Sequence, residues 1–167
     1  MINWTLILAL LIPNMGGWAG TISMRGQVKQ PDGKAWYQLL IKPSWNPPPW
    51  VFGPAWTILY TMMGYASYRV YDQCGGFTEA AVFPLALYGG HLILNWLWTP
   101  VFFGLHKIGL ALIHMLFLDA AATATAISFY RTNATAGLLL LPYLGWLSFA
   151  TFLNYTIWTL NSNVKEM

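Results

Sequence analysis

The chain contains five apolar stretches, each about as long as a helix that crosses a lipid bilayer. The hydrocarbon core of a bilayer is about 30 Å thick, and about 20 helical residues are needed to span it. Of the 167 residues, 57% are hydrophobic and only 8% are charged. A soluble domain of this composition would expose large apolar patches to water. The sequence therefore predicts an all-α integral membrane protein, a single domain folded as a bundle of five transmembrane helices.

The predicted spans follow the apolar stretches. Backbone groups in lipid must form hydrogen bonds within their own segment, and the stretches lack the alternation of barrel strands, so each is expected to be a helix. The longest connection, residues 25–50, is expected to form one or two amphipathic turns at 35–41 and a stiff, proline-rich lead into the second span. The spans are placed at residues 2–24, 51–71, 80–104, 108–130 and 136–160.

Basic residues are distributed unevenly between the two sides of the predicted bundle. An excess of Lys and Arg marks the cytosolic side of a membrane protein, so we expect the C-terminus in the cytosol. The net charge of +3 then indicates a basic rim that faces anionic lipid headgroups, and nucleic acid is not an expected partner. The cytosolic side would hold Arg25, Lys29, Lys34, Lys42, Lys107 and Lys165, and the opposite side Arg69 and Arg131.

The sequence contains no pattern typical of a metal, cofactor or hydrolytic site. His106 and His114 are eight residues apart, and no neighbouring Cys, Asp or Glu completes a ligand set. The single Cys74 has no partner for an internal disulfide. Asp119 lies near the centre of a span, where a charge costs about 2.5 to 3.5 kcal/mol, so we expect it to be protonated or paired with His91 or with a Thr of its own helix. We therefore predict no metal ion and no cofactor.

Aromatic and polar side chains recur at helical spacing along the spans. Polar groups inside a bilayer normally face the interior of the bundle, so these stripes are expected to converge on an aromatic cavity, while Trp45 and Trp50 lie at the interface or in a lid. The stripes, in the order of the spans, are Gly17, Thr21, Met24; Trp56, Tyr60, Met63; His91, Asn95, Trp98, Phe102; Leu112, Met115, Asp119, Thr123; and Trp146, Ala150, Leu153.

Four motifs in this chain have a clear counterpart among known families. They are KPSWNPPPW at 42–50, GPAWTILY at 53–60, LNWLW at 94–98 and PYLGWLSFATFLNY at 142–155. Together they resemble the translocator protein family, also called tryptophan-rich sensory proteins or peripheral benzodiazepine receptors, and most closely its animal branch. The resemblance implies a five-helix bundle whose pocket opens toward the cytosol, is capped by the first loop, and binds porphyrins, sterols and synthetic drug-like ligands.

The resemblance also implies a location and a set of site residues. Animal members lie in the mitochondrial outer membrane with a cytosolic C-terminus, which agrees with the charge distribution. A homodimer in the bilayer is a further state to be tested. The ligand-binding positions carried over by motif are Thr21, Met24, Gly53, Trp56, Tyr60, Asn95, Trp98, Leu110, Ile113, Trp146, Ala150 and Leu153.

Two departures from the family pattern concern the ligand. Leu110 stands where mammalian relatives have a Trp, and the sterol motif, which begins with Leu153 and Tyr155, has Thr159 where a basic residue is required. Sterol binding is therefore less expected than pocket binding in general. Two other functions stay open: a photochemical enzyme that degrades tetrapyrroles, with Trp56 and Trp146 as electron donors, and a scaffold that dimerises through glycine-rich helix faces. Of these readings we favour a binding protein without enzymatic activity.

Overall fold

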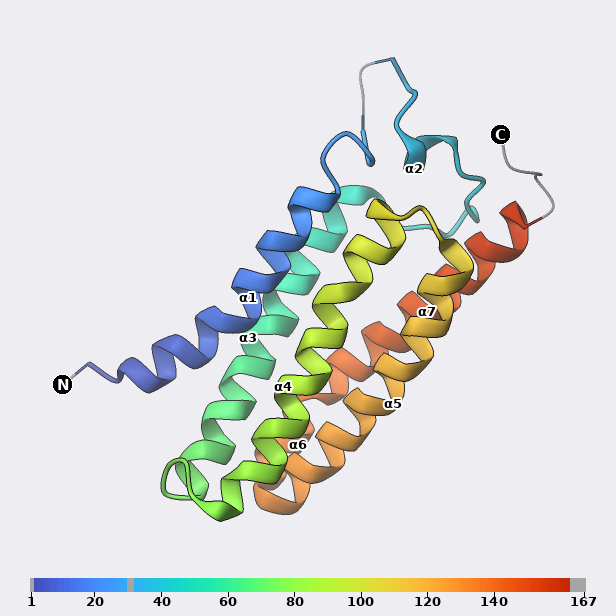
Figure 1. Cartoon of the computed structure of the whole chain (residues 1–167). Helices are drawn as coiled ribbons and strands as arrows, with labels where there is room; N and C mark the ends of the chain where they lie inside the picture. The colour runs from blue at the N-terminus through green and yellow to red at the C-terminus, as the bar shows by residue number, and fades with distance from the viewer. Residues whose placement is uncertain (1, 30–31, 163–167) are drawn as a thin grey trace.

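The computed structural model describes residues 2–29 and 32–162, and its regular elements there are helices. The elements are α1 (Trp4–Ser23), α2 (Trp36–Leu39), α3 (Pro49–Gln73), α4 (Glu79–Thr99), the π-helical turn η1 (Pro100–Gly104), α5 (Ile108–Thr132), α6 (Ala134–Leu139) and α7 (Leu141–Asn161). In Figure 1 the long helices run side by side, and the first loop with its short helix α2 lies at one end of the bundle, the end at which α7 finishes.

The all-α class is confirmed, but the count of five membrane spans is not. Within the described residues, four helical segments are long and apolar enough to cross a membrane: Trp4–Ser23, Glu79–Gly104, Ile108–Thr132 and Ala134–Asn161. The expected fifth span, α3, has 25 residues but lower hydropathy, because Trp, Tyr, Gly and Pro occupy many of its positions. One face of α3 is buried against other helices, so this helix needs less apolar surface than one surrounded by lipid.

Prolines determine where several helices begin and end. α3 begins at Pro49, two residues before the predicted start, because proline at the first helical position loses no hydrogen bond and has a suitable φ. α4 ends at Thr99, and the predicted remainder to 104 is the wider turn η1, in which Leu105 N–H bonds to the carbonyl of Pro100 at 3.0 Å. The fifth predicted span is two helices, α6 and α7, and Pro142 lies in the first turn of α7.

The remaining predicted elements agree with the structure. α1 and α5 begin and end within two residues of their predicted spans. The short helix expected within 35–41 is confirmed as α2. Lys165, which was counted with the cytosolic side, lies outside the described residues.

The first helix packs closely on its neighbours through glycines. A side chain at Gly64 of α3 would overlap the backbone carbonyl of Ala9, and one at Gly16 would overlap the indole ring of Trp96 on α4. The same indole donates a hydrogen bond from Nε1 to the carbonyl of Pro13 at 3.2 Å. Gly20 also faces α4, with Thr99 at 3.4 Å from an added Cβ. The glycine face of α1 is thus used for packing within the chain.

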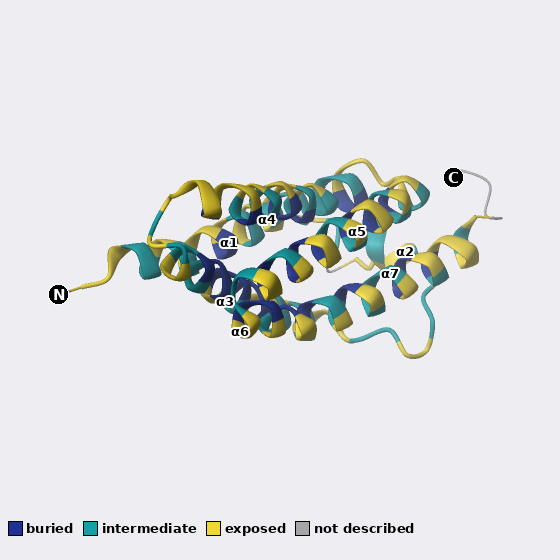
Figure 2. Cartoon of the chain, turned by 90° about the horizontal axis from the view of Figure 1, so that it is seen from below, coloured by how far each residue is buried: buried dark blue, intermediate teal, exposed yellow. Residues whose placement is uncertain are grey.

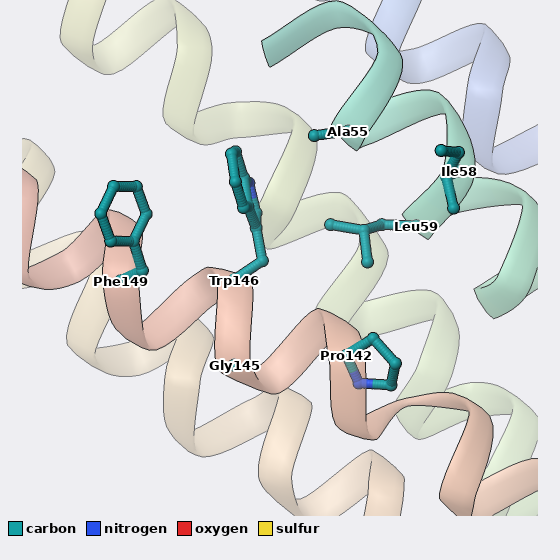
Figure 3. A pocket seen from close by; sticks show the side chains of 7 residues that line it. All are labelled: Ala55, Ile58, Leu59, Pro142, Gly145, Trp146 and Phe149. Atoms are coloured by element: carbon teal, nitrogen blue, oxygen red, sulfur yellow. The ribbon is translucent and has the colours of Figure 1, made fainter. Parts of the chain in front are cut away.

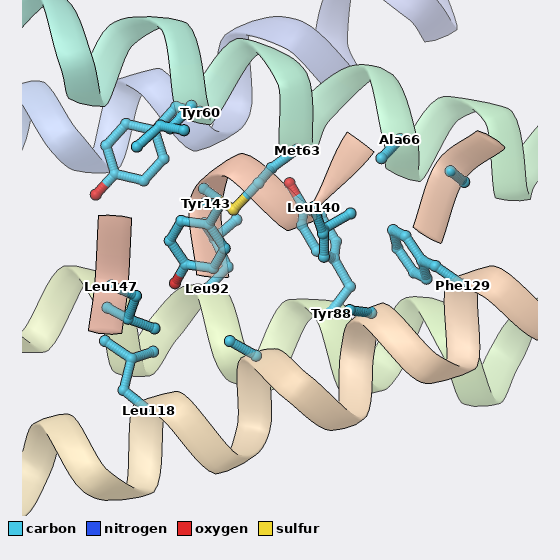
Figure 4. Close-up of a cluster of buried hydrophobic side chains, with 14 of the residues drawn as sticks. Tyr60, Met63, Ala66, Tyr88, Leu92, Leu118, Phe129, Leu140, Tyr143 and Leu147 are labelled. Atoms are coloured by element: carbon cyan, nitrogen blue, oxygen red, sulfur yellow. The ribbon is translucent and has the colours of Figure 1, made fainter. Parts of the chain in front are cut away.

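A dense core fills the end of the bundle that lies away from the first loop. Figure 2 shows the buried faces of the helices turned inward and the exposed faces outward. Figure 4 shows the centre of this core, where Tyr60 and Met63 of α3, Tyr88 of α4, Phe129 of α5 and Tyr143 of α7 meet. Met63, Phe129 and Tyr143 are completely buried. Because this core holds the helices together at one end, they enclose space at the other.

Candidate ligand-binding cavity

A cavity of about 490 Å³ lies between α1, α3, α4, α5 and α7, at the end of the bundle covered by the first loop. Small-molecule sites in proteins typically measure about 300 to 1,000 Å³ and are mostly apolar with a few polar groups. Aromatic and aliphatic side chains dominate this wall, together with the amides of Asn14, Asn95 and Asn154. Among the described residues that line it there is no Asp, Glu, Lys, Arg or His. The cavity wall therefore suits a largely apolar ring system, and any charged substituent of a ligand must lie outside this wall.

Ten of the twelve residues predicted to bind ligand lie in the wall of this cavity. Nine of them belong to four of the five predicted stripes, so the inward faces of α1, α3, α4 and α7 follow from helical spacing, whereas Gly53 was taken from the family motif alone. Whether these residues bind a ligand stays a prediction. The ten residues are Thr21, Met24, Gly53, Trp56, Tyr60, Asn95, Trp98, Trp146, Ala150 and Leu153.

The predictions for α5 need correction. Leu110 and Ile113 are 46% and 54% exposed and lie outside the cavity lining. The inward face of α5 includes Met115, which the predicted stripe contained, and Leu118, which it did not. Both are buried, at 2% and 1% exposure, whereas Thr123 of the stripe is exposed. Leu110 and Ile113 point elsewhere because each residue of a helix is rotated by 100° from its predecessor.

Aromatic rings from three helices form the wall. Trp56 stacks on Tyr60, with 5.3 Å between ring centroids, and lies edge-on to Trp146 at 6.5 Å. Trp98 of α4 stacks on Phe102 of η1, with 4.9 Å between ring centroids. The wider turn of η1 brings Phe102 and the adjacent Phe103 into the same wall. Aromatic faces and edges from α3, α4 and α7 are therefore available to a flat ligand.

A hydrogen-bonded chain of three buried side chains crosses the bundle beside the cavity. The Tyr60 hydroxyl donates to Oδ1 of Asn95, and Nδ2 of Asn95 donates to the Tyr143 hydroxyl at 2.8 Å. The chain joins α3, α4 and α7, so Asn95 holds these three helices in position. Asn95 and Tyr60 are both among the predicted ligand-binding positions, but much of their hydrogen-bonding capacity is used within the protein.

Asp119 has a partner other than those predicted. Its Oδ2 accepts a hydrogen bond of 2.7 Å from the hydroxyl of Thr151 on α7. The expectation of a paired carboxyl is confirmed, but neither His91 nor a Thr of α5 is the partner of its side chain. His91 is buried between the rings of Tyr88 and Tyr143, outside the cavity lining. No group of three or more His, Cys, Asp or Glu in the described part of the chain could hold a metal ion.

The first loop covers the cavity, and its residues 35–46 form the part that we call the lid. Tyr37 of the lid lines the cavity, and its hydroxyl donates to Oδ1 of Asn46 at 3.2 Å. Burial raises the pKa of Tyr37. Trp36 stacks on the His106 ring at 4.4 Å and lies edge-on to Phe102 at 5.4 Å. These contacts place the lid directly on the aromatic turn at the end of α4.

Polar contacts fasten the lid to the last turn of α7. Oδ1 of Asn161 accepts from the Ile41 N–H at 3.0 Å, and Nδ2 of Asn161 donates to the Ile41 carbonyl at 2.9 Å. The Lys42 ammonium donates to the carbonyls of Tyr37 at 2.6 Å and Leu40 at 2.7 Å, and burial lowers the pKa of Lys42. The lid is thereby anchored to a helix that forms part of the cavity wall.

The two tryptophans expected at the interface or in the lid differ in their contacts. Trp45 stacks on Phe152 of α7 with 5.4 Å between centroids and is 42% exposed. Trp50, in the first turn of α3, is 74% exposed. Neither ring lines the cavity.

A separate apolar groove of about 310 Å³ lies on the outside of the bundle between α3 and α7. Figure 3 shows Trp146 between the two helices, with Ala55, Ile58 and Leu59 on one side and Pro142 and Phe149 on its own helix. Gly145 forms part of this surface, and a Cβ added there would meet no atom within 4 Å. Trp146 is the residue that the groove shares with the cavity.

Comparison with known proteins connects this cavity with a family. Residues 9–159 match the TspO/MBR family. The chain is 49% identical over 148 residues to the translocator protein of Homo sapiens, covering 89% of this chain and 85% of that protein. It is 40% identical over 164 residues to the tryptophan-rich sensory protein of Cereibacter sphaeroides, covering 98% and 96%, respectively. The match spans the helices and the cavity described above, and the chain belongs to the TspO/MBR family.

Proposed function

We propose that the chain is a membrane protein that binds a flat hydrophobic molecule, a porphyrin or related tetrapyrrole in the first place, in the cavity beneath the lid. The observation that carries this proposal is the uncharged cavity with aromatic rings from three helices in its wall. Family membership supports a role in ligand binding or transport at a membrane. Sterols and synthetic drug-like molecules are further candidate ligands, and a link to the transport of porphyrin or cholesterol belongs to the same proposal.

Stacking accounts for the preference for a flat ligand. Each aromatic pair contributes about 0.5 to 1.5 kcal/mol beyond the burial of its surface. A broad conjugated ring can meet several such partners at once, including Trp56 of α3 and Trp98 of α4. A saturated ligand of equal volume gains the burial of apolar area without this additional term.

For a sterol the arrangement is less favourable. The incomplete sterol motif does not present one continuous surface, because Leu153 lines the cavity while Tyr155 is 48% exposed and lies outside its lining. Thr159 donates its hydroxyl to the carbonyl of Thr156 and offers no positive charge. We therefore place sterols after porphyrins among the candidate ligands.

The proposal includes a membrane topology in which α3 is the fifth span. Its 25 residues correspond to about 37 Å of helix, which is long enough to cross the hydrocarbon core. With α3 as the fifth span, the distribution of basic residues supports a cytosolic lid and a cytosolic C-terminus, and the resemblance to the animal proteins supports the mitochondrial outer membrane. A tag after Met167 would then be cleaved by protease added to intact mitochondria, whereas a tag before Met1 would be protected.

Photochemical degradation of a bound tetrapyrrole is the second candidate function. One observation favours it: Trp56 and Trp146, the expected electron donors, both line the cavity. Incubation of the purified protein with protoporphyrin in the dark and in light, followed by analysis of the products, separates a binding protein from such an enzyme. A dimerising scaffold receives less support, because Gly16 and Gly20 pack against α4 of the same chain.

Two tryptophan substitutions test the binding proposal. Replacing Trp56 or Trp146 by Ala removes stacking and leaves a void, so we expect the free energy of protoporphyrin binding to weaken by about 1 to 3 kcal/mol. The dissociation constant would rise roughly tenfold to more than a hundredfold. Trp4→Ala is the control, since Trp4 is 65% exposed and lies outside the cavity lining. Titrations followed by tryptophan fluorescence decide the question: equal affinities for all three variants contradict a binding site in this cavity.

A further inference from the structure

We propose that the ligand enters and leaves the cavity sideways from the bilayer, through the groove between α3 and α7, with the Trp146 side chain as the gate. This inference rests on the proposed function, because it concerns the route of the same ligand. It gives Trp146 a role in ligand exchange in addition to its place in the cavity wall.

The groove is suited to a molecule dissolved in lipid. Its lining consists of Ala55, Ile58, Leu59, Pro142, Gly145, Trp146 and Phe149, none of which is charged. Ile58 is 61% exposed, so the groove is open on the outer surface of the bundle. The absence of a side chain at Gly145 leaves open space beside the indole ring. An apolar ligand in the bilayer can therefore occupy the groove without removing water from polar groups.

The Trp146 ring separates the groove from the cavity, and no hydrogen bond to the described residues holds it. Its Nε1 is buried without a partner, so a rotation of the ring breaks no hydrogen bond. Its neighbours are rings at an angle to it: Phe149 at 5.5 Å, Phe52 at 5.8 Å and Trp56 at 6.5 Å between centroids. Trp96, by contrast, is anchored through Nε1 to a backbone carbonyl of α1. A rotation of the Trp146 ring therefore breaks apolar contacts alone, whereas a rotation of Trp96 would also break a hydrogen bond.

The opposite route, through the lid, requires more contacts to break. Displacing the lid separates both hydrogen bonds between Asn161 and Ile41 and the stack of Trp36 on His106. It also exposes the aromatic side chains of η1 to water. Passage beside Trp146 exchanges apolar contacts for apolar contacts and leaves the lid in place.

The decisive measurement compares rate constants with affinity. A substitution that narrows the portal without touching the bound ligand slows association and dissociation by the same factor and leaves the dissociation constant unchanged. Gly145→Phe places a ring in the open groove, and Gly90→Phe is the matched control, since Gly90 is an exposed glycine of α4 that also has nothing within 4 Å of an added Cβ. Protoporphyrin binding to the full chain in liposomes is followed by stopped-flow quenching of tryptophan fluorescence.

We expect Gly145→Phe to lower the association and dissociation rate constants about tenfold each, which corresponds to about 1.4 kcal/mol of activation free energy. The dissociation constant should stay within about twofold of the wild-type value. Ile58→Ala widens the groove and is expected to raise both rate constants, so the test does not depend on one variant. Under this route Asn161→Ala leaves the association rate constant unchanged.

Three results overturn the portal: wild-type rate constants in both groove variants, equal slowing by Gly90→Phe, or faster association in Asn161→Ala alone. If protoporphyrin does not bind to the wild-type protein, the proposed function fails and the portal with it. Binding with unaltered rates in the groove variants refutes the portal and leaves the proposed function intact.

Discussion

Replacing Asn95 by Leu tests whether the buried amide stabilises the bundle around the cavity. Asn95 is 5% exposed, accepts a hydrogen bond from Tyr60 and donates one to Tyr143. Leucine has a similar volume but forms neither bond. Both hydroxyls would stay in place, at 6% and 0% exposure of their residues, without their present partner. The loss is therefore one of polar pairing with little change in packing.

The magnitude follows from the two bonds that are lost. Hydrogen bonds between helices of membrane proteins contribute about 0.6 kcal/mol on average and up to about 1.7 kcal/mol. We therefore expect Asn95→Leu to lower the free energy of unfolding by roughly 1 to 3 kcal/mol. The triple variant Asn95→Leu, Tyr60→Phe, Tyr143→Phe should recover part of this loss, because an apolar replacement of all partners leaves no buried hydroxyl unpaired.

Unfolding in mixed micelles, by titration with a denaturing detergent and detection by tryptophan fluorescence, measures these differences. The two single Tyr→Phe variants serve as controls for the hydroxyls alone. An Asn95→Leu protein as stable as the wild type would refute the structural role of the amide. So would a triple variant less stable than Asn95→Leu by the full cost of both hydroxyls, because that result would mean that the three side chains act independently.

Three further predictions concern packing, the lid and the sterol motif. Gly64→Ala should lower the free energy of unfolding in mixed micelles by about 1 to 3 kcal/mol, because the added methyl group overlaps a backbone carbonyl of α1. Gly89→Ala should raise the free energy of unfolding by up to about 1 kcal/mol, because the space around Gly89 is open and Ala favours the helix. Asn161→Ala should speed amide hydrogen exchange in the lid, as measured by mass spectrometry. The same variant should weaken protoporphyrin binding a few-fold through faster dissociation, as measured by stopped flow. An unchanged exchange rate in the lid would show that this anchor is dispensable. Thr159→Arg completes the sterol motif and should strengthen sterol binding to the protein in liposomes, and equal affinities would show that the missing cation has no role.

Helical spacing predicted the inward faces where the side chains on the two sides of a helix differ. In α3, α4 and α7 the inward residues include Tyr60, Asn95 and Trp146, whose polar or amphipathic side chains identify the face that points into the bundle. In α5 the inward Met115 and Leu118 are as apolar as the outward residues, because lipid and protein core favour the same side chains. Helical periodicity then contains little information about which face of α5 points inward, and Leu110 and Ile113, which were taken from the resemblance, lie outside the cavity lining.

Contacts between distant segments could not be predicted from local sequence. Ile41 and Asn161 are 120 residues apart, and nothing in either neighbourhood indicates that an amide side chain pairs with a backbone there. Likewise, the spacing within α5 suggested partners for Asp119 on its own helix, while Thr151 approaches from α7 only in the folded bundle. The turn η1 was missed because a π-helical turn depends on how the chain leaves Pro100, and the apolar pattern continues through it.

The anchor between α7 and the lid couples the cavity to the surface of the protein. Leu153 and Ile157 of α7 line the cavity, and Asn161, one turn further along, fixes the backbone of the lid. Linkage between two equilibria is reciprocal, so a ligand that binds more tightly under the fastened lid stabilises that fastening by the same factor. Leu39 and Ile41 of the lid are 67% and 50% exposed. A partner that binds these two side chains only while the lid is fastened would therefore bind more tightly when the cavity is occupied, without touching the ligand.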